Sequence, residues 1–163
     1  MKKSVTDQHW DEWGKKNPYR GVLGVESSSM NQANVEAAFF ASGEAHIASV
    51  LDIITRHFGG MQSMSSALDF GCGVGRLVLP LSRRFEQVTG VDVSPTMIEL
   101  ARQRVGDDPR IDFVHSLLAI EPSRRYDLVH SYIVMQHIRP KQGYPIISSL
   151  LDRVAPGGSS RCT

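Results

Sequence analysis

The stretch that best indicates the fold lies near the middle of the chain and reads Ala67-Leu68-Asp69-Phe70-Gly71-Cys72-Gly73-Val74-Gly75-Arg76-Leu77. An apolar start leads into an acidic residue, three glycines at alternate positions and an apolar segment with helical spacing. This pattern predicts a buried parallel strand, then a tight turn that opens a helix. Glycine permits left-handed backbone angles and close approach of a ligand, and a helix start offers unpaired N–H groups. The turn is therefore suited to a polar ligand at the carboxyl end of the strand.

The spacing of the glycines argues against a dinucleotide site. The G-x-G-x-x-G pattern of such sites, counted from Gly71, requires a glycine where the chain has Arg76. Asp69 precedes the first glycine, and its carboxylate would repel a pyrophosphate but suits a cationic or hydroxyl-rich ligand. A ligand of that second kind is predicted. The alternative is a tight strand-to-helix turn that binds nothing.

A second stretch, Gly90-Val91-Asp92-Val93-Ser94-Pro95, supplies another carboxylate at a strand end. The β-rich residues before Asp92 predict a strand, while Ser94 and Pro95 are typical of an N-cap and a first helical position. Asp92 lies 19 positions after Gly73, close to the offset of about 20 residues expected of an acid that binds ribose hydroxyls. The alternative is that Asp92 merely caps the following helix, a role that Ser94 already fills.

Both stretches, in order and spacing, resemble motif I and the strand-two motif of the class I S-adenosylmethionine-dependent methyltransferases. Tyr126-Asp127-Leu128-Val129 is similar to the family's Phe-Asp-hydrophobic-Val segment, and Met135-Gln136-His137-Ile138-Arg139-Pro140 is similar to the motif after it. The resemblance covers about residues 43–158. It implies an α/β fold, a three-layer Rossmann-like and mostly parallel sheet with helices on both faces, preceded by an N-terminal helical segment.

The resemblance also assigns expected roles at the site. Asp69 would orient the amino group of the methionine part of S-adenosyl-L-methionine, and Val93 and Met97 would flank the adenine ring. Ser131 and Tyr132 would lie near the methionine part, and His137 near the substrate mouth. The residues expected to contact the cofactor are Asp69, Gly71, Cys72, Gly73, Asp92, Val93, Met97, Ser116, Leu117 and Ser131.

His137 has two interpretations. It is a candidate general base if the methyl acceptor is a hydroxyl, because the pKa of histidine lies near working pH. Alternatively it caps or packs, since a lone histidine is a weak signal.

The loop after the third predicted strand departs from the family. Many relatives have a Gly-Asp-Ala-like run there, whose acidic residue reaches the adenine amino group, whereas this chain has Ser116-Leu117-Leu118. The side-chain contact to adenine is therefore missing or comes from elsewhere. The backbone N–H near Leu118 could still serve, and Ser116 is a partial substitute.

Residues 1–42 are expected to form a helical or lid segment, and residues 43–163 the cofactor-binding domain. A short helix is predicted over residues 6–16, and an amphipathic helix is predicted to follow the break at Ser42-Gly43 and to end at Gly59-Gly60. His46 is expected on the surface of that helix. In the glycine motif's own helix, predicted over residues 74–85, Arg76 is expected to be solvated.

The end of the chain predicts an incomplete sheet. Four strands are clear, at best a stub of a fifth follows residue 158, and the last residues are too polar for a buried parallel strand. We therefore expect a fold with its final strands missing, apparently truncated at the C-terminus.

Composition limits the remaining possibilities. The chain has 163 residues and a net charge of +1, so one domain is expected, and neither charge nor a basic stripe calls for a nucleic-acid partner. No signal peptide and no apolar run of membrane-spanning length is expected. The two cysteines suggest neither a disulfide framework nor a metal cluster, so a reducing cytoplasm is expected.

The predicted function is methyl transfer from S-adenosylmethionine to a small-molecule acceptor, by in-line attack of a nucleophile on the activated methyl group. The alternative is a non-catalytic cofactor-binding or regulatory remnant of a methyltransferase. A nicotinamide-dependent enzyme is disfavoured by Arg76. The acceptor and the oligomeric state stay open.

Overall fold

The fold was taken from a computed structural model, which describes residues 12, 15, 19 and 32–162. The helix predicted over residues 6–16 lies largely outside these residues. The described elements, in chain order, are α3 (Gln32–Phe58), β1 (Ser66–Phe70), α4 (Val78–Ser82), β2 (Gln87–Val91), α5 (Pro95–Val105), β3 (Ile111–Val114), η1 (Leu117–Ala119), β4 (Tyr126–Ser131), η2 (Met135–His137), α6 (Pro140–Leu151) and β5 (Val154–Cys162).

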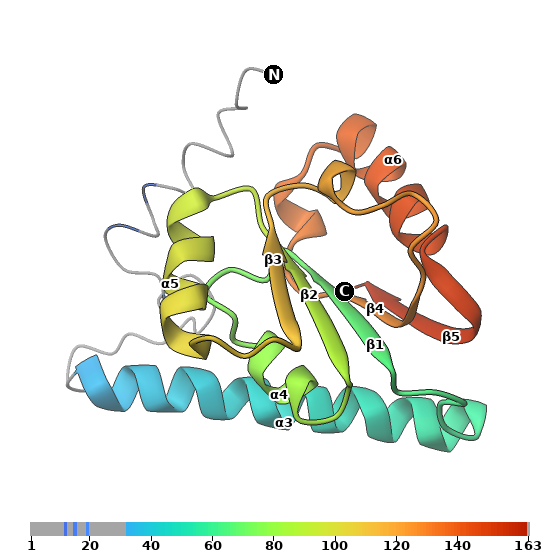
Figure 1. The fold of residues 1–163 in the computed structure, drawn as a ribbon, viewed down its shortest axis with the longest axis horizontal. Helices are drawn as coiled ribbons and strands as arrows, with labels where there is room; N and C mark the ends of the chain where they lie inside the picture. The colour runs from blue at the N-terminus through green and yellow to red at the C-terminus, as the bar shows by residue number, and fades with distance from the viewer. Residues whose placement is uncertain (1–11, 13–14, 16–18, 20–31, 163) are drawn as a thin grey trace.

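The strands form one parallel sheet in the order β3-β2-β1-β4-β5, which confirms the predicted α/β architecture. Alternate residues of each strand face opposite sides. Ala67 and Leu128 belong to an apolar core with α3, α4 and α5, whereas Leu68 and Val129 belong to a second core with α6 and η1. Figure 1 shows α3 and α6 on opposite sides of the sheet. The order reverses at β1, so the carboxyl ends of β1, β2 and β4 form the crevice that binds ligands in such sheets.

The polar end of the chain forms a strand, and the expectation of a stub was wrong. β5 pairs in parallel with β4 from Leu128 opposite Ser159 to Ser131 opposite Cys162, after a register shift that follows Tyr126. Strand pairing uses backbone groups, and the described β5 side chains up to Ser159 are half-buried or exposed. Polar side chains therefore carry little desolvation penalty in β5, the edge strand of the described sheet.

Helix α3 is continuous, and the predicted break at Ser42-Gly43 was wrong. Ser42 Oγ donates to the Phe39 carbonyl oxygen at 2.6 Å, so its hydroxyl is satisfied inside the helix. A Cβ on Gly43 would collide with the Arg76 carbonyl oxygen, so glycine here permits close packing. The helix crosses the expected boundary at residues 42/43, and the division into lid and domain stays a prediction.

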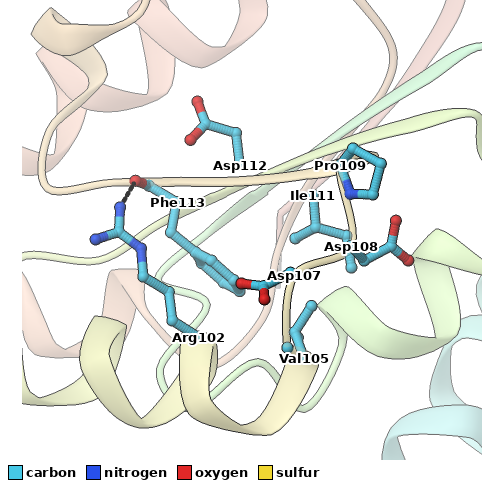
Figure 2. Close-up of a pocket in the computed structure, with 9 residues that line it drawn as sticks. Arg102, Val105, Asp107, Asp108, Pro109, Ile111, Asp112 and Phe113 are labelled. Carbon is cyan, nitrogen blue, oxygen red and sulfur yellow. Dashed lines mark hydrogen bonds between the residues drawn. The ribbon is translucent and has the colours of Figure 1, made fainter.

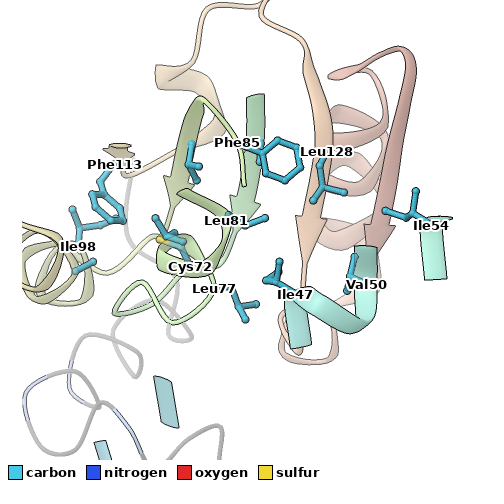
Figure 3. Packing of buried hydrophobic residues seen from close by; sticks show 14 residues of the cluster. Ile47, Val50, Ile54, Cys72, Leu77, Leu81, Phe85, Ile98, Phe113 and Leu128 are labelled. Atoms are coloured by element: carbon cyan, nitrogen blue, oxygen red, sulfur yellow. The ribbon is translucent and has the colours of Figure 1, made fainter. Parts of the chain in front are cut away.

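By length and composition, residues Ala33–Phe58 of α3 would suffice to cross a membrane, contrary to the sequence expectation. In the structure, the apolar side chains of Ile47, Val50 and Ile54 are buried against the sheet and α4, as Figure 3 shows. Of the apolar window, 28% is buried, and this stripe is the part of the helix that packs on the sheet.

Helix α4 is much shorter than the predicted helix over residues 74–85. It begins at Val78, because the chain from Gly71 to Leu77 is still in turns and Gly75 has a φ of +83°. The glycine motif therefore extends as a loop up to the helix.

Candidate functional site

The glycine turn after β1 has the left-handed backbone that its sequence predicts. Gly71, Gly73 and Gly75 have φ values of +77°, +51° and +83°. The amides of Gly71 and Cys72 donate to the Val91 carbonyl oxygen at 2.7 and 3.0 Å, which ties the turn to the end of β2. A Cβ on Gly71 would overlap Val134, whereas one on Gly73 would have no heavy atom of the described residues within 4 Å. The backbone at Gly73 is therefore open to a ligand.

The thiol of Cys72 lies inside this turn and is buried. Burial raises its pKa, and the carboxylates of Asp92 and Asp69 raise it further. Cys72 contributes a small apolar surface below the turn, and its predicted cofactor contact would come from the backbone.

Asp92 connects β2 to the glycine turn. Its Oδ2 accepts from the Gly73 amide and its Oδ1 from the Ser94 amide, both at 2.9 Å. Burial raises the pKa of this carboxyl, while the two backbone hydrogen bonds act in the opposite direction. Ser94 caps α5 as predicted, since its Oγ accepts from the Met97 amide. Each carboxylate oxygen has a second lone pair, so Asp92 retains the capacity to accept ribose hydroxyls.

Asp69 lies beneath α3 in a chain of side chains that sequence reasoning missed. It is 1% exposed, and its Oδ1 lies 2.9 Å from Nδ1 of the fully buried His130. His130 Nε2 lies 3.1 Å from His46 Nε2, so His46, expected on the helix surface, is half-buried with its ring against His130. Asp69 and His130 are register partners in adjacent strands, and that pairing is the signal that could have found them. Asp69 Oδ2 is buried and has no hydrogen-bond partner among the described residues.

Arg76 is buried rather than solvated, because α3 covers it. Its Nη1 donates to Ser42 Oγ at 3.0 Å, and its guanidinium lies 5.6 Å from the Phe39 ring and 5.5 Å from the Tyr132 ring. Burial lowers the pKa of Arg76, and the charge of Asp69 raises it in part. The side chain thus joins the glycine turn to α3 and to the segment after β4.

The wall expected to contact adenine combines buried and exposed side chains. Met97 and Leu117 are buried, whereas Val93 is 42% exposed and Leu118 is 87% exposed. Ser116 Oγ accepts from the Leu118 amide at 3.2 Å, so the N–H expected to serve adenine already has an acceptor. The structure gives no replacement for the missing acidic residue in this loop.

Ser131 and His137 differ in their surroundings. Ser131 is fully buried and donates to the Phe70 carbonyl oxygen at 3.0 Å, so its hydroxyl links β4 to β1 at their carboxyl ends. His137 is exposed in η2, with its Nε2 3.1 Å from Gln136 Nε2. Its role as a base stays a prediction. Between them, Ile133 has a φ of +61°, which is unusual for a β-branched residue and marks strain beside the site.

A separate cavity of about 350 Å³ lies between α5 and β3, as Figure 2 shows. Arg102 closes one side by donating to the Phe113 carbonyl oxygen at 2.8 Å. Its lining residues are Arg102, Val105, Gly106, Asp107, Asp108, Pro109, Ile111, Asp112 and Phe113. None of the predicted site residues lines it, and the segment before β3 lies at the amino ends of the strands.

The chain is similar to known methyltransferases in family pattern, in sequence and in fold. A family model described as a methyltransferase domain matches residues 67–158. The chain is 30% identical over 102 residues to malonyl-[acyl-carrier protein] O-methyltransferase 1 of Ilyobacter polytropus, covering 61% of this chain and 37% of that protein. It is 32% identical over 117 residues to the mitochondrial ubiquinone biosynthesis O-methyltransferase of Schizosaccharomyces pombe, covering 66% and 41%. The chain therefore spans about two fifths of the length of these curated relatives.

Solved structures share the fold over nearly the whole chain. Phosphoethanolamine N-methyltransferase 1 of Haemonchus contortus, in complex with phosphoethanolamine and S-adenosylhomocysteine, superposes with a TM-score of 0.72 at 17% identity, covering 98% of this chain and 32% of that one. The N-methyltransferase NodS of Bradyrhizobium japonicum, in complex with S-adenosylhomocysteine, superposes with a TM-score of 0.70 at 19% identity, covering 96% and 71%.

Proposed function

Because the chain belongs to the methyltransferase-domain family, as its resemblance to the class I S-adenosylmethionine-dependent methyltransferases predicted, we propose that it binds S-adenosylmethionine and transfers its methyl group to a small-molecule acceptor. The cofactor would lie across the carboxyl ends of β1 and β2, over the glycine turn. The two curated relatives matched by sequence are O-methyltransferases, which favours an oxygen nucleophile as the acceptor. The two N-methyltransferases match at 17% and 19% identity and show the fold alone.

One observation carries the proposal: a buried carboxylate oxygen without a donor lies at the base of an open glycine turn. Asp69 Oδ2 has no partner among the described residues, and a buried acceptor without a donor is costly. An ammonium group would satisfy it by donating a charge-assisted hydrogen bond. The open backbone at Gly73 leaves room for the ligand that carries that group.

The two carboxylates suit the charges and hydroxyls of this cofactor. Asp69 would accept from the amino group of the methionine part, and the remaining lone pairs of Asp92 would accept from the ribose hydroxyls. Val93 and Met97 would contact the adenine ring, and the backbone of Cys72 would lie against the ligand. The other predicted contacts, from Gly71, Ser116, Leu117 and Ser131, belong to the same proposal.

When bound, S-adenosylmethionine supplies a methyl group activated by a sulfonium centre. The chain's own residues orient that centre and bring the nucleophile into line, so most of the acceleration comes from proximity and alignment. The resemblance places His137 near the substrate mouth, and His137 is the sequence-based candidate for a general base if the acceptor is a hydroxyl. A cytoplasmic location stays an expectation from the sequence.

Calorimetric titration with S-adenosylhomocysteine tests the binding step, and transfer of a labelled methyl group to hydroxyl and carboxyl compounds tests the reaction. We expect one site per chain and transfer to an oxygen acceptor. Binding without transfer to any acceptor would favour the cofactor-binding remnant. No binding by a folded sample would reject both functions.

A further inference from the structure

We propose that His46, His130 and Asp69 form a proton relay beside the methyl-transfer site, with His46 as the group that takes the proton of the acceptor hydroxyl. The inference rests on the proposed function and deepens it, because transfer to a hydroxyl requires that its proton be removed. It assigns the base to α3 instead of to His137.

The three side chains are arranged in series. Asp69 Oδ1 lies 2.9 Å from His130 Nδ1, and His130 Nε2 lies 3.1 Å from His46 Nε2. Ligands of one metal ion would converge on a common point, whereas here each nitrogen of His130 contacts a different neighbour. Consistent with this, no group of three metal-ligating side chains was found among the described residues.

The burial of the three side chains indicates which end of the relay can reach the acceptor. Asp69 and His130 are almost completely buried, at 1% and 0% exposure, whereas His46 is half-buried. The His46 ring packs against the Tyr132 ring, with centroids 4.1 Å apart, and Tyr132 directly follows the carboxyl end of β4. His46 is therefore the least buried member of the relay. It lies at the carboxyl edge of the sheet, where the cofactor is proposed to bind.

The hydrogen bonds define a consistent set of tautomers. An ionised Asp69 accepts from His130 Nδ1–H, so His130 Nε2 carries a lone pair and accepts from His46 Nε2–H. His46 Nδ1 is then the acceptor nitrogen of that ring. His130 and Asp69 are positioning residues in this arrangement, since they act on the acceptor only through His46.

Protons and charges balance along this path. The acceptor oxygen forms a bond to the methyl carbon as the bond from that carbon to sulfur breaks, and sulfur changes from a cation to a neutral thioether. The hydroxyl proton moves to His46 Nδ1 while the Nε2 proton of His46 moves to His130 Nε2. His130 becomes an imidazolium beside the Asp69 carboxylate, so one positive charge moves from sulfur to His130. Return through His46 releases the proton to water.

The titratable groups around the relay come from several elements. Asp69 comes from β1, Cys72 and Arg76 come from the glycine turn, and Tyr132 follows β4. Asp92, at the end of β2, also interacts electrostatically with Asp69. The carboxylate of Asp69 lies beside His130, and the Arg76 cation interacts with the same carboxylate. The relay as proposed carries one proton at a time.

Side-chain ¹⁵N NMR of the histidines during a pH titration tests the relay in the unmodified chain. S-adenosylmethionine and S-adenosylhomocysteine differ by one methyl group and one positive charge, so the two complexes compare the relay with and without the reacting charge. We expect the ¹⁵N signals of His46 and His130 to change together over one pH range, and that range to differ between the two complexes because only S-adenosylmethionine carries the positive charge. His57, exposed on the same helix, should have one midpoint in both complexes.

Two variants assign the signals and provide a matched control. His46→Gln should abolish the coupled transition, whereas His57→Gln should leave it unchanged. Independent titrations of His46 and His130, or equal midpoints in the two complexes, would overturn the relay while leaving cofactor binding intact. If neither cofactor bound a folded sample, the proposed function would fail, and the relay with it.

Discussion

The Gly73 amide donates to Asp92 Oδ2 at 2.9 Å, so the carboxylate proposed to bind the ribose also holds the glycine turn against β2. An asparagine at position 92 has one carbonyl oxygen and could accept from only one of the two amides that Asp92 now satisfies.

We therefore expect Asp92→Asn to lower the affinity for S-adenosylhomocysteine at least tenfold, or about 1.4 kcal/mol. Calorimetry gives the affinity, and circular dichroism checks the fold. Asp112→Asn, on the exposed side of β3, is the matched control and should bind as the unmodified chain does. Equal affinities in the two variants would contradict the assigned role of Asp92.

Alanine substitutions at Gly71 and Gly106 distinguish the cost of backbone strain from the cost of overpacking. Both have positive φ, but a Cβ on Gly71 would overlap Val134, whereas one on Gly106 would meet no atom within 4 Å in the part of the chain that the structure describes. Gly106→Ala should cost about 1–3 kcal/mol through backbone strain alone, because its φ of +71° and ψ of −157° are almost confined to glycine. Gly71→Ala should cost about 1–3 kcal/mol more, because overpacking against Val134 is added to the strain. Urea unfolding measures both, and equal losses would show that Val134 yields to the added methyl group.

Glu44 links α3 to the end of α4 through Arg84 and Arg83. The hydrogen bond from Arg84 is the main cause that lowers the Glu44 pKa. The ion pairs therefore stabilise the fold above the unfolded-state pKa of about 4.5, and this stabilisation is lost as pH falls through the lower folded-state pKa.

Glu44→Gln should lower the free energy of unfolding by about 0.5–1 kcal/mol at pH 7. The loss should be almost zero at a pH below the folded-state pKa of Glu44, where the carboxyl is already neutral. Asp52→Asn, which breaks a pair within α3, is the control and should cost about 0.3 kcal/mol. Urea unfolding at several pH values gives these differences. A cost for Glu44→Gln that did not change with pH would contradict the electrostatic explanation.

Arg153, next to the start of β5, binds the loop after β3 through backbone carbonyl groups. It is 7% exposed, and its guanidinium donates to the carbonyl oxygens of Glu121, Leu117 and Ile120. Arg153→Met should lower the free energy of unfolding by about 2–4 kcal/mol, because buried carbonyl groups lose their donor. Hydrogen exchange in η1 should rise. Arg125→Met, at an exposed position, should change neither quantity, and unaltered exchange in η1 of Arg153→Met would contradict the support role.

Much of the fold was predictable because the local sequence signals favour the same elements that the sheet requires. The glycine turn, the Ser94 cap and the order of strands and helices each have a strong local signal, and the structure agrees with them. The strand β5 was missed because its pairing depends on backbone groups, which polar residues such as Ser159 provide as well as apolar ones. The length of α4 was missed because the glycine loop continues up to Leu77.

The site was only partly predictable, since its buried polar contacts join segments far apart in the sequence. Asp69 and Asp92 were found from their places at strand ends. His130 and His46 were missed because their relation to Asp69 depends on strand register and on how α3 lies across the sheet. Arg76 was expected in solvent for the same reason, since only the packing of α3 buries it.

The proposal that the cofactor lies over the glycine turn is best tested by adding one methyl group. Gly73→Ala places a Cβ in space that the described residues leave open, and Gly106→Ala does the same near the amino ends of the strands, away from the proposed site. Both variants should lose about 1–3 kcal/mol of stability through backbone strain. Calorimetric titration with S-adenosylhomocysteine should give at least tenfold weaker binding for Gly73→Ala and unchanged binding for Gly106→Ala. Equal affinity of the two folded variants would show that the ligand does not lie at this turn.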